Sequence, residues 1–303
     1  MALPVPCFHP LKAFRDSNGI RVLNSDADLF NLLLPCGRCI GCRLERSRQW
    51  AIRCMHEASL HEFNSFVTLT YDDAHVPADG GLHHAHFQKF MKRLRKRFPQ
   101  DIRYYMCGEY GPVNNRPHFH VILFGLTFTD LSLWKRTSAD EVIFRSATLE
   151  KLWPFGFSSI GAVTFQSCAY VARYIMQKQT GDSGAKHYRD KGFIDTETGE
   201  VFGLRPEYNR MSLRPAIGKR WFEKFGLTDV FPHDRVVYDG SESKPPRYYD
   251  KLFSRIDADG FANIQDKRIL DSQENLADST PARLIDKETV LSARVNRLKR
   301  GFT

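Results

Sequence analysis

The stretch that decides the fold is Arg116-Pro117-His118-Phe119-His120-Val121-Ile122-Leu123-Phe124-Gly125. Its apolar run after the second histidine ends at a glycine, which is typical of a strand in the core of a sheet. Because side chains alternate across a strand, His118 and His120 are expected on one face and Phe119 and Val121 on the other. The sequence therefore predicts a core strand that brings two imidazoles to one point.

A carboxylate precedes this strand at a distance that a hairpin can close. Glu109 stands near the end of a strand-like run, Arg103–Tyr110, and the turn-forming link Gly111-Pro112-Val113-Asn114-Asn115 follows it. A hairpin at this link would place Glu109 beside His118 and His120, and the three side chains could hold a divalent metal ion. A His-x-His tripeptide by itself is more often structural, so the metal interpretation depends on the rest of the chain.

Two tyrosines follow in Ala169-Tyr170-Val171-Ala172-Arg173-Tyr174-Ile175-Met176-Gln177-Lys178. Tyr170, Tyr174 and Lys178 recur at intervals of four residues, so they share one face of the expected helix, for which Ser167 is the expected N-cap. Tyrosines at this spacing can simply pack in a core. Together with the histidine strand they indicate nucleophiles, with Lys178 as a cation that assists loss of the phenolic proton.

The order of these motifs resembles a known family of DNA-processing enzymes. A strand ending in Thr68-Leu69-Thr70-Tyr71 precedes Glu109, and then come Pro117-His118-Phe119-His120 and Tyr170-Val171-Ala172-Arg173-Tyr174. This order is similar to that of the His-hydrophobe-His endonucleases that start rolling-circle DNA replication, and most similar to the replication initiators of gokushovirus-type microviruses, small phages with single-stranded circular genomes. The resemblance extends over most of the chain, from residue 7 to residue 249.

The resemblance implies a metal-dependent DNA endonuclease. Glu109, His118 and His120 would hold Mg²⁺ or Mn²⁺, and imidazole ligands favour Mn²⁺. Thr70 and Tyr71, at the end of the preceding strand, would contact DNA near the cleaved phosphate. Ordinary packing and pairing within the strand is the alternative role for Tyr71.

The resemblance also implies strand transfer by tyrosine. Tyr170 or Tyr174 would attack the phosphodiester, which leaves a 5′-phosphotyrosine link and a free 3′-hydroxyl for the host polymerase. The other tyrosine would attack at the regenerated origin and let the released strand close into a circle. Which tyrosine attacks first does not follow from the sequence.

Composition and charge indicate a globular protein with a polyanionic partner. The 303 residues carry a formal charge of +9 and are 42% hydrophobic. The expected partners are single-stranded origin DNA, a host helicase and a host polymerase. No apolar run reaches the ~20 residues of a membrane span and the N-terminus lacks a signal peptide, which predicts action in the bacterial host cytoplasm without membrane contact. Two basic clusters lie in or near expected helices: Arg38, Arg43, Arg46, Arg48 and Arg53, and Lys89, Lys92, Arg93, Arg95, Lys96 and Arg97.

The cysteine pattern points to a second metal site. Three of the seven cysteines follow one another with two residues between them: Cys36, Cys39 and Cys42. Cys7, or His9 in its place, could complete a tetrahedral zinc site that fastens the N-terminal segment to the rest of the chain. The same spacing opens a bacterial iron–sulfur motif, but Arg46 stands where the fourth cysteine of that motif would fall. Structural Zn²⁺ is therefore favoured, and unligated cytosolic thiols are the alternative.

These patterns predict an α+β fold with a central antiparallel sheet of about five strands flanked by helices, as in His-hydrophobe-His endonucleases and ferredoxin-like or RRM-like folds. Residues 1–64 would form an N-terminal segment with the cysteine cluster and a long helix. Residues 65–180 would form the endonuclease core, and residues 181–303 a basic helical extension packed on it. Within the core, residues 126–150 look like a polar connection, and a strand is expected near residues 160–165.

Three other functions fit parts of the sequence. A plasmid relaxase or transposase of the same superfamily would share the chemistry but usually has different histidine motifs and tyrosine spacing. A non-enzymatic RNA-binding module with an open RRM-like sheet would explain the basic charge, yet it needs neither Glu109 nor the histidine pair. A hydrolase that activates water would use the metal and leave the tyrosines dispensable.

Overall fold

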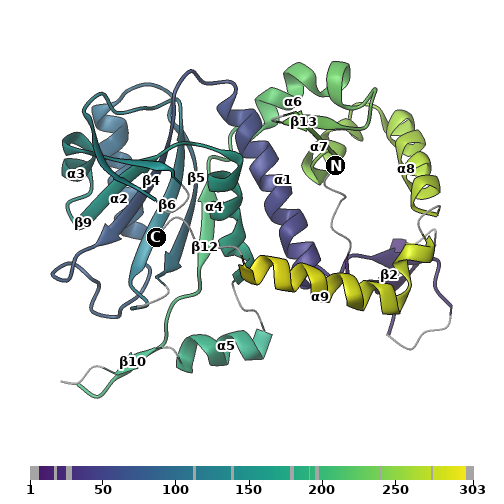
Figure 1. The fold of residues 1–303 in the computed structure, drawn as a ribbon, viewed down its shortest axis with the longest axis horizontal. Helices are drawn as coiled ribbons and strands as arrows, with labels where there is room; N and C mark the ends of the chain where they lie inside the picture. The colour runs from purple at the N-terminus through teal and green to yellow at the C-terminus, as the bar shows by residue number, and fades with distance from the viewer. Residues whose placement is uncertain are drawn as a thin grey trace. The chain divides into compact units, whose positions relative to one another are not determined.

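The histidine strand forms β6 (Pro117–Phe124), which lies between β5 and β4 in a seven-stranded sheet of the computed structural model (Figure 1). The structure describes residues 7–16, 19–24, 29–111, 114–137, 140–177, 181–190, 192–194, 198–238, 240–273 and 276–297. By their contacts these residues form two units. One combines the chain up to Gln49 with the part from Phe225 onward, and the other is Trp50–Lys224, which contains the large sheet.

All neighbouring strands of the large sheet run antiparallel, in the order β12-β5-β6-β4-β9-β8-β7. The β5–β6 hairpin pairs Glu109 with His118, and β4 places Thr70 opposite the same histidine on its other side. The predicted hairpin is therefore present. The strands besides β6 are β4 (Asn64–Tyr71), β5 (Arg103–Tyr110), β7 (Leu131–Arg136), β8 (Val142–Ser146), β9 (Gly156–Gly161) and β12 (Tyr208–Met211).

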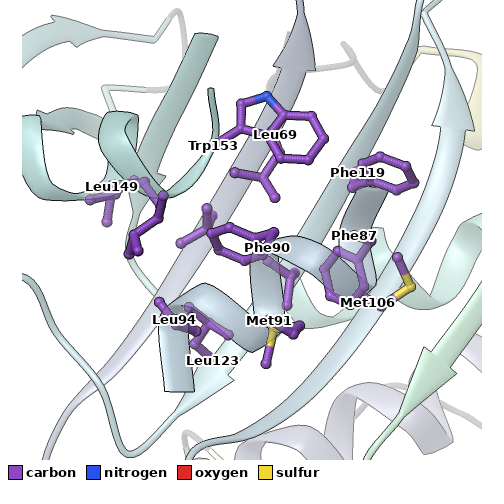
Figure 2. Close-up of a cluster of buried hydrophobic side chains, with 14 of the residues drawn as sticks. Leu69, Phe87, Phe90, Met91, Leu94, Met106, Phe119, Leu123, Leu149 and Trp153 are labelled. Carbon is purple, nitrogen blue, oxygen red and sulfur yellow. The ribbon is translucent and has the colours of Figure 1, made fainter. Parts of the chain in front are cut away.

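Helices pack on both faces of this sheet. On one face, α2 (His84–Arg97) and α3 (Ala147–Leu152) enclose an apolar core with Phe119 of β6 (Figure 2). On the other face, α4 (Phe165–Gln177) and the second half of α1 (Ile40–Ala58) pack on Ile122 and Phe124 of β6. Because residues two apart share a face, His118 and His120 lie on the face that α4 covers. The other large members of the first core include Leu69, Phe87, Phe90, Leu94, Leu123, Leu149 and Trp153.

Helix α4 is fixed at its start by two reciprocal hydrogen bonds. The Thr164 N–H donates to Ser167 Oγ at 2.8 Å, and the Ser167 N–H donates to Thr164 Oγ1 at 3.1 Å. This is a capping box with Thr164 as the N-cap. The prediction of Ser167 as the N-cap is wrong by three residues, because the helix begins at Phe165.

The remaining elements of the Trp50–Lys224 unit follow α4. They are α5 (Gly181–Asp190), the small hairpin of β10 (Phe193–Ile194) and β11 (Val201–Phe202), and α6 (Lys219–Phe225), which ends at the boundary between the units. Asn209 of β12 links the sheet to α4, because its amide donates to the Val171 carbonyl oxygen and to the Tyr105 hydroxyl, each at 3.1 Å.

The other unit contains two small antiparallel sheets and several helices. The sheets are formed by β1 (Leu11–Asp16), β2 (Gly19–Val22) and β3 (Leu32–Leu34), and by β13 (Val236–Tyr238) and β14 (Ser241–Ser243). The first part of α1 belongs to this unit. Its other helices are the π-helical η1 (Gly226–Val230), α7 (Arg247–Phe253), α8 (Ala258–Gln273), the 3₁₀ turn η2 (Leu276–Ser279) and α9 (Pro281–Arg297).

The predicted α+β class and antiparallel sheet are confirmed, but the sheet has seven strands instead of about five. Strands β7 and β8 lie in the segment 126–150, whose sequence looks like a polar connection. The strand expected near residues 160–165 is β9, which ends at Gly161, so that prediction lies too far along the chain. The divisions at residues 64 and 180 stay a prediction. Among the described residues no helix is both long and apolar enough to cross a membrane.

Candidate metal centre and tyrosine site

Glu109, His118 and His120 meet on the α4 side of the sheet. Oε1 of Glu109 lies 2.6 Å from Nε2 of each histidine, and one ligand atom from each residue lies within 4.8 Å of the others. All three side chains are buried. The three predicted ligands therefore converge, and the hairpin register of β5 and β6 is the reason.

Each histidine is held by its second ring nitrogen. Nδ1 of His118 donates to the Arg116 carbonyl oxygen at 3.0 Å, and Nδ1 of His120 lies 2.9 Å from Oγ1 of Thr68 on β4. These contacts leave both Nε2 atoms directed at Glu109. Metal-binding histidines are usually oriented in this way by a partner at the other nitrogen.

The three groups set one another's charge. Burial disfavours the carboxylate, but the two histidines outweigh this effect and lower the pKa of Glu109. Burial also disfavours the imidazolium, yet the hydrogen bond with Glu109 raises the pKa of His118, whereas at His120 burial dominates and lowers the pKa. Glu109 in its ionised form and His120 in its neutral form are the states in which these side chains bind metal ions.

The bonding capacity of Glu109 is only partly used. Its buried Oε2 atom has no hydrogen-bond partner among the described residues, whereas Oε1 has several. Leaving a buried charged oxygen without a partner is costly, and a bound cation would remove that cost. Two imidazole nitrogens and a carboxylate suit Mn²⁺ and related divalent ions. The residues thus fit the predicted metal.

Tyr170 points from α4 into the same place. Its hydroxyl donates a hydrogen bond to Glu109 Oε1 at 3.2 Å, and its ring meets the His120 ring edge-on, with centroids 5.0 Å apart. Burial, followed by the negative charge of Glu109, raises the pKa of Tyr170 far above the ordinary value for a phenol. The resting side chain is therefore a neutral hydrogen-bond donor held beside the candidate metal ligands.

The other two predicted members of the helix face are only partly placed. The backbone of Tyr174 lies in α4, one turn after Tyr170, but its side chain is outside the described residues. Lys178 is outside them as well. Their roles stay predictions from the sequence.

A cavity of about 350 Å³ opens beside the histidines. One of its walls is Trp134 of β7, whose side chain is 51% exposed, with the Lys135 ammonium group 4.6 Å from the ring centroid. Neither Trp134 nor Thr68 was predicted as a site residue. The signal for the first is an aromatic residue followed by two cations in Trp134-Lys135-Arg136. The residues that bear on function are Thr68, Thr70, Arg116, His118, His120 and Trp134.

Tyr71 lies away from this cavity. It is fully buried on the α2 face, its hydroxyl is 2.9 Å from Nδ1 of His86, and its ring packs edge-on against Trp153. The expectation that Tyr71 contacts DNA is therefore wrong, and its role is core packing. Thr70, the preceding residue, faces the opposite way and lines the cavity with His118.

The basic residues of α2 are mostly exposed, but this helix covers the face of the sheet opposite the histidines. Arg53 of α1 is buried, and its guanidinium donates to the Ile217 carbonyl oxygen at 2.9 and 3.1 Å. These two predicted basic clusters are therefore not the walls of the cavity beside His118 and His120.

The predicted cysteine ligands also converge, in the other unit. One sulfur from each of Cys7, Cys36, Cys39 and Cys42 lies within 4.8 Å of the others. His9, the alternative fourth ligand, instead pairs with Glu288 at 2.7 Å.

Comparison with known proteins gives the same direction as the site. Residues 64–180, which include β4 to α4, match a family model that describes replication-associated proteins of the ORF2 type. No solved structure matches the chain.

Three curated relatives are replication-associated proteins. VP4 of Bdellovibrio phage phiMH2K is 32% identical over 88% of this chain and 83% of its own length, and ORF2 of Spiroplasma virus 4 is 29% identical over 88% and 79%. ORF4 of Chlamydia phage 1 is 34% identical over 75% of this chain and 55% of its own. The chain therefore belongs to the family of replication-associated proteins of these phages, which confirms the resemblance to gokushovirus-type microviruses.

Proposed function

We propose that the protein is a replication-initiation endonuclease that nicks single-stranded origin DNA and rejoins it through a 5′-phosphotyrosine intermediate. Membership of a replication-associated family supports the biological process. The observation that carries the chemistry is the hydrogen bond from the Tyr170 hydroxyl to Glu109, because it joins a nucleophile to a carboxylate that also contacts His118 and His120.

In the proposed reaction, the phenolic oxygen of Tyr170 attacks the phosphorus atom of one phosphodiester. The bond between phosphorus and the 3′ oxygen breaks, and that oxygen leaves as a 3′-hydroxyl after taking up a proton in place of the one lost by the phenol. The phosphate stays joined to the 5′ end of the downstream strand and to tyrosine. One ester is exchanged for another, so attack by a 3′-hydroxyl can later restore the DNA without an external energy source.

A divalent cation held by Glu109, His118 and His120 would polarise the scissile phosphate and neutralise its developing charge. The protein's own residues keep the reacting groups aligned: β5 and β6 carry the ligands, and α4 carries the tyrosine. Because burial and Glu109 raise the pKa of Tyr170, the phenol keeps its proton in the resting protein. Attack then requires a substrate and cation that replace the Glu109 hydrogen bond.

Tyr174 is proposed as the second nucleophile, and Lys178 as the cation that assists it. While one tyrosine holds a 5′ end, the other attacks the regenerated origin. The 3′-hydroxyl released by this second attack then attacks the first phosphotyrosine link and closes the displaced strand into a circle. The four-residue spacing of the tyrosines, one helical turn, supports this alternation.

The cavity beside the histidines is proposed to receive an unpaired strand. Thr70 lies at its floor near His118, and Trp134 offers an exposed ring on which a base can stack. Stacking on aromatic side chains favours single strands, because their bases are free to leave the helix stack. Lys135, next to this ring, can contact a phosphate.

The products define the proposed partners. The free 3′-hydroxyl would be extended by a host polymerase, while a host helicase separates the strands ahead of it. Both steps would take place in the cytoplasm of the bacterial host.

The test is covalent trapping by the full chain. Single-stranded oligonucleotides tiled across the phage genome are labelled at either end, incubated with Mn²⁺ and separated on a denaturing gel. We expect a detergent-resistant adduct that carries the 3′ label, and a released fragment that carries the 5′ label and ends in a 3′-hydroxyl. Tyr170→Phe/Tyr174→Phe should form no adduct, whereas Tyr104→Phe, on the opposite face of β5, should behave as wild type.

Other outcomes identify the rival functions. Cleavage without any adduct would indicate a hydrolase that activates water. Tight, metal-independent binding of RNA or DNA without cleavage would indicate a binding module. Cleavage that never leads to joined circles would favour a relaxase or transposase with a single working tyrosine.

A further inference from the structure

The four clustered cysteines have the sulfur spacing of a mononuclear metal site. The Sγ atoms of Cys36 and Cys42 lie 4.0 Å apart, as do those of Cys7 and Cys39. Zinc bound tetrahedrally at 2.3 Å from each sulfur places the sulfurs ~3.8 Å apart. We propose that Cys7, Cys36, Cys39 and Cys42 bind one structural Zn²⁺ ion, and that this ion fastens the N-terminal segment to the start of α1 and to α9.

Backbone N–H groups surround the sulfurs. Cys36 Sγ accepts from the N–H groups of Arg38 at 3.4 Å and Cys39 at 3.3 Å, and Cys7 Sγ accepts from that of Cys36 at 3.2 Å. Cys39 Sγ accepts from Phe8 at 3.4 Å and Cys42 at 3.5 Å. Such donors favour charged sulfur, because hydrogen bonds to ionised groups are the strongest. The arrangement therefore suits thiolates bound to a metal better than neutral thiols.

Local backbone geometry produces this pattern. Gly37 follows the first cysteine of the cluster with φ of +73°, a conformation that costs glycine little and other residues more. The turn that it permits directs the N–H groups of Arg38 and Cys39 back to Cys36 Sγ. Helix α1 then begins at Ile40 and carries Cys42 in its first turn.

The sulfur distances also decide between zinc and the other uses of cysteine. A disulfide requires sulfurs about 2.05 Å apart, and the cysteines of the described residues are all free. In an iron–sulfur cluster each cysteine binds a different iron atom, which spreads the cysteine sulfurs more widely than a single ion does. Arg46 in place of a fourth local cysteine does not exclude a cluster, since Cys7 could replace it, but the short sulfur distances do.

The site joins segments that are distant in the sequence. Phe8, next to Cys7, is buried with Cys39 and with Leu284 of α9, and Leu291 packs on the same small cluster. Nε2 of His9 pairs with Oε2 of Glu288 at 2.7 Å, also on α9. So few buried apolar side chains stabilise a unit weakly, whereas structural zinc contributes folding free energy directly.

The first experiment measures metal in the purified full chain by mass spectrometry. We expect one zinc per chain in the wild type, in Cys54→Ala and in His118→Ala/His120→Ala, and almost none in Cys36→Ser/Cys39→Ser. Cys54 is a buried cysteine remote from the cluster in sequence, and the histidine variant removes the other metal centre. Zinc retained in the cysteine variant, or iron with cluster absorption in the wild type, would overturn the proposal.

A second measurement uses only the wild-type chain, in case the cysteine variant does not fold. Zinc is displaced by stepwise addition of a mercurial thiol reagent and followed with a zinc-sensitive dye, and the apo chain is reloaded with Co²⁺. We expect full zinc release when four thiols have reacted, and visible absorption typical of tetrahedral cobalt thiolate after reloading. Release that does not depend on thiol modification, or octahedral cobalt spectra, would refute thiolate ligation.

Discussion

The hydroxyl group of Tyr170 and the carboxylate of Glu109 are joined by a 3.2 Å hydrogen bond at the oxygen that also lies 2.6 Å from both His118 and His120. The helix and the hairpin therefore meet at one atom. This relationship leads to separate predictions for the nucleophile and for the metal ligands.

Replacing each tyrosine should separate two steps of the reaction. Tyr170→Phe removes the hydroxyl that contacts Glu109 and should lower the first cleavage by at least ~10³-fold, the order expected when a nucleophile is lost. Tyr174→Phe should retain more of the first cleavage but impair joining. Cleavage and joining rates on origin oligonucleotides measure both effects. If Tyr174→Phe cleaves and joins as the wild type does while Tyr170→Phe is inactive, a one-tyrosine mechanism replaces the alternation.

The hydroxyl of Thr68 should set metal affinity through His120. Its Oγ1 atom lies 2.9 Å from Nδ1 of that ring, so Thr68→Val leaves the ring less firmly oriented. Loss of such an outer contact typically weakens metal binding by ~10–100-fold. Calorimetric titration with Mn²⁺ in the absence of DNA measures the effect, with Thr70→Val on the same strand face as the control. Equal affinities of the two variants would show that this contact does not position the ligand.

Trp134 should contribute to binding of single strands. Base stacking on an aromatic side chain is worth ~1–3 kcal/mol, so Trp134→Ala should raise the Kd for single-stranded DNA by about 5- to 150-fold and leave duplex binding nearly unchanged. Fluorescence anisotropy with labelled oligonucleotides gives both constants. Leu133→Ala is the matched control, because Leu133 is the neighbouring exposed residue of β7. An equal loss in both variants would point to a general effect on the hairpin.

His56 should make the stability of the sheet unit depend on pH. Its ring is buried against Trp221, with centroids 3.4 Å apart, and burial lowers the pKa of His56 to about 3. The unfolded chain binds this proton near pH 6.5, so the contribution is complete above that pH and is lost as the pH falls towards 3, by up to ~1.4 kcal/mol per pH unit.

Denaturant unfolding between pH 7 and pH 4 tests this prediction. His56→Phe keeps an aromatic ring beside Trp221 but cannot be protonated, so its unfolding midpoint should fall less steeply than that of the wild type over this interval. His75→Phe, at an exposed histidine, serves as the control. Parallel curves for the wild type and His56→Phe would mean that other groups cause the acid sensitivity.

The central hairpin could be predicted from the sequence because its information is local. Alternation along β6 fixes which side chains share a face with His118, and the link after Glu109 fixes the hairpin register. The side of the sheet that Tyr170 faces follows from the helix period once α4 is known to pack on β5 and β6.

The rest of the site depends on contacts that a local pattern does not contain. All the side chains of β7 are exposed, so no alternation marks the strand that carries Trp134. The partner of His120 is Thr68, which comes from the neighbouring strand β4. Asn209 supports α4 from β12, far along the chain, and its role becomes visible only when β12 pairs with β5.

Mass-spectrometric mapping of the trapped adduct tests the central claim most directly. Trypsin cuts after Arg173, so Tyr170 falls in the peptide 152–173 and Tyr174 in the peptide 174–178. With Mn²⁺ and the cleaved oligonucleotide, the account predicts a nucleotide joined through its 5′ phosphate to one of these two tyrosines, and no adduct when EDTA is present from the start. DNA cleaved without a modified tyrosine, or an adduct elsewhere in the chain, would contradict it.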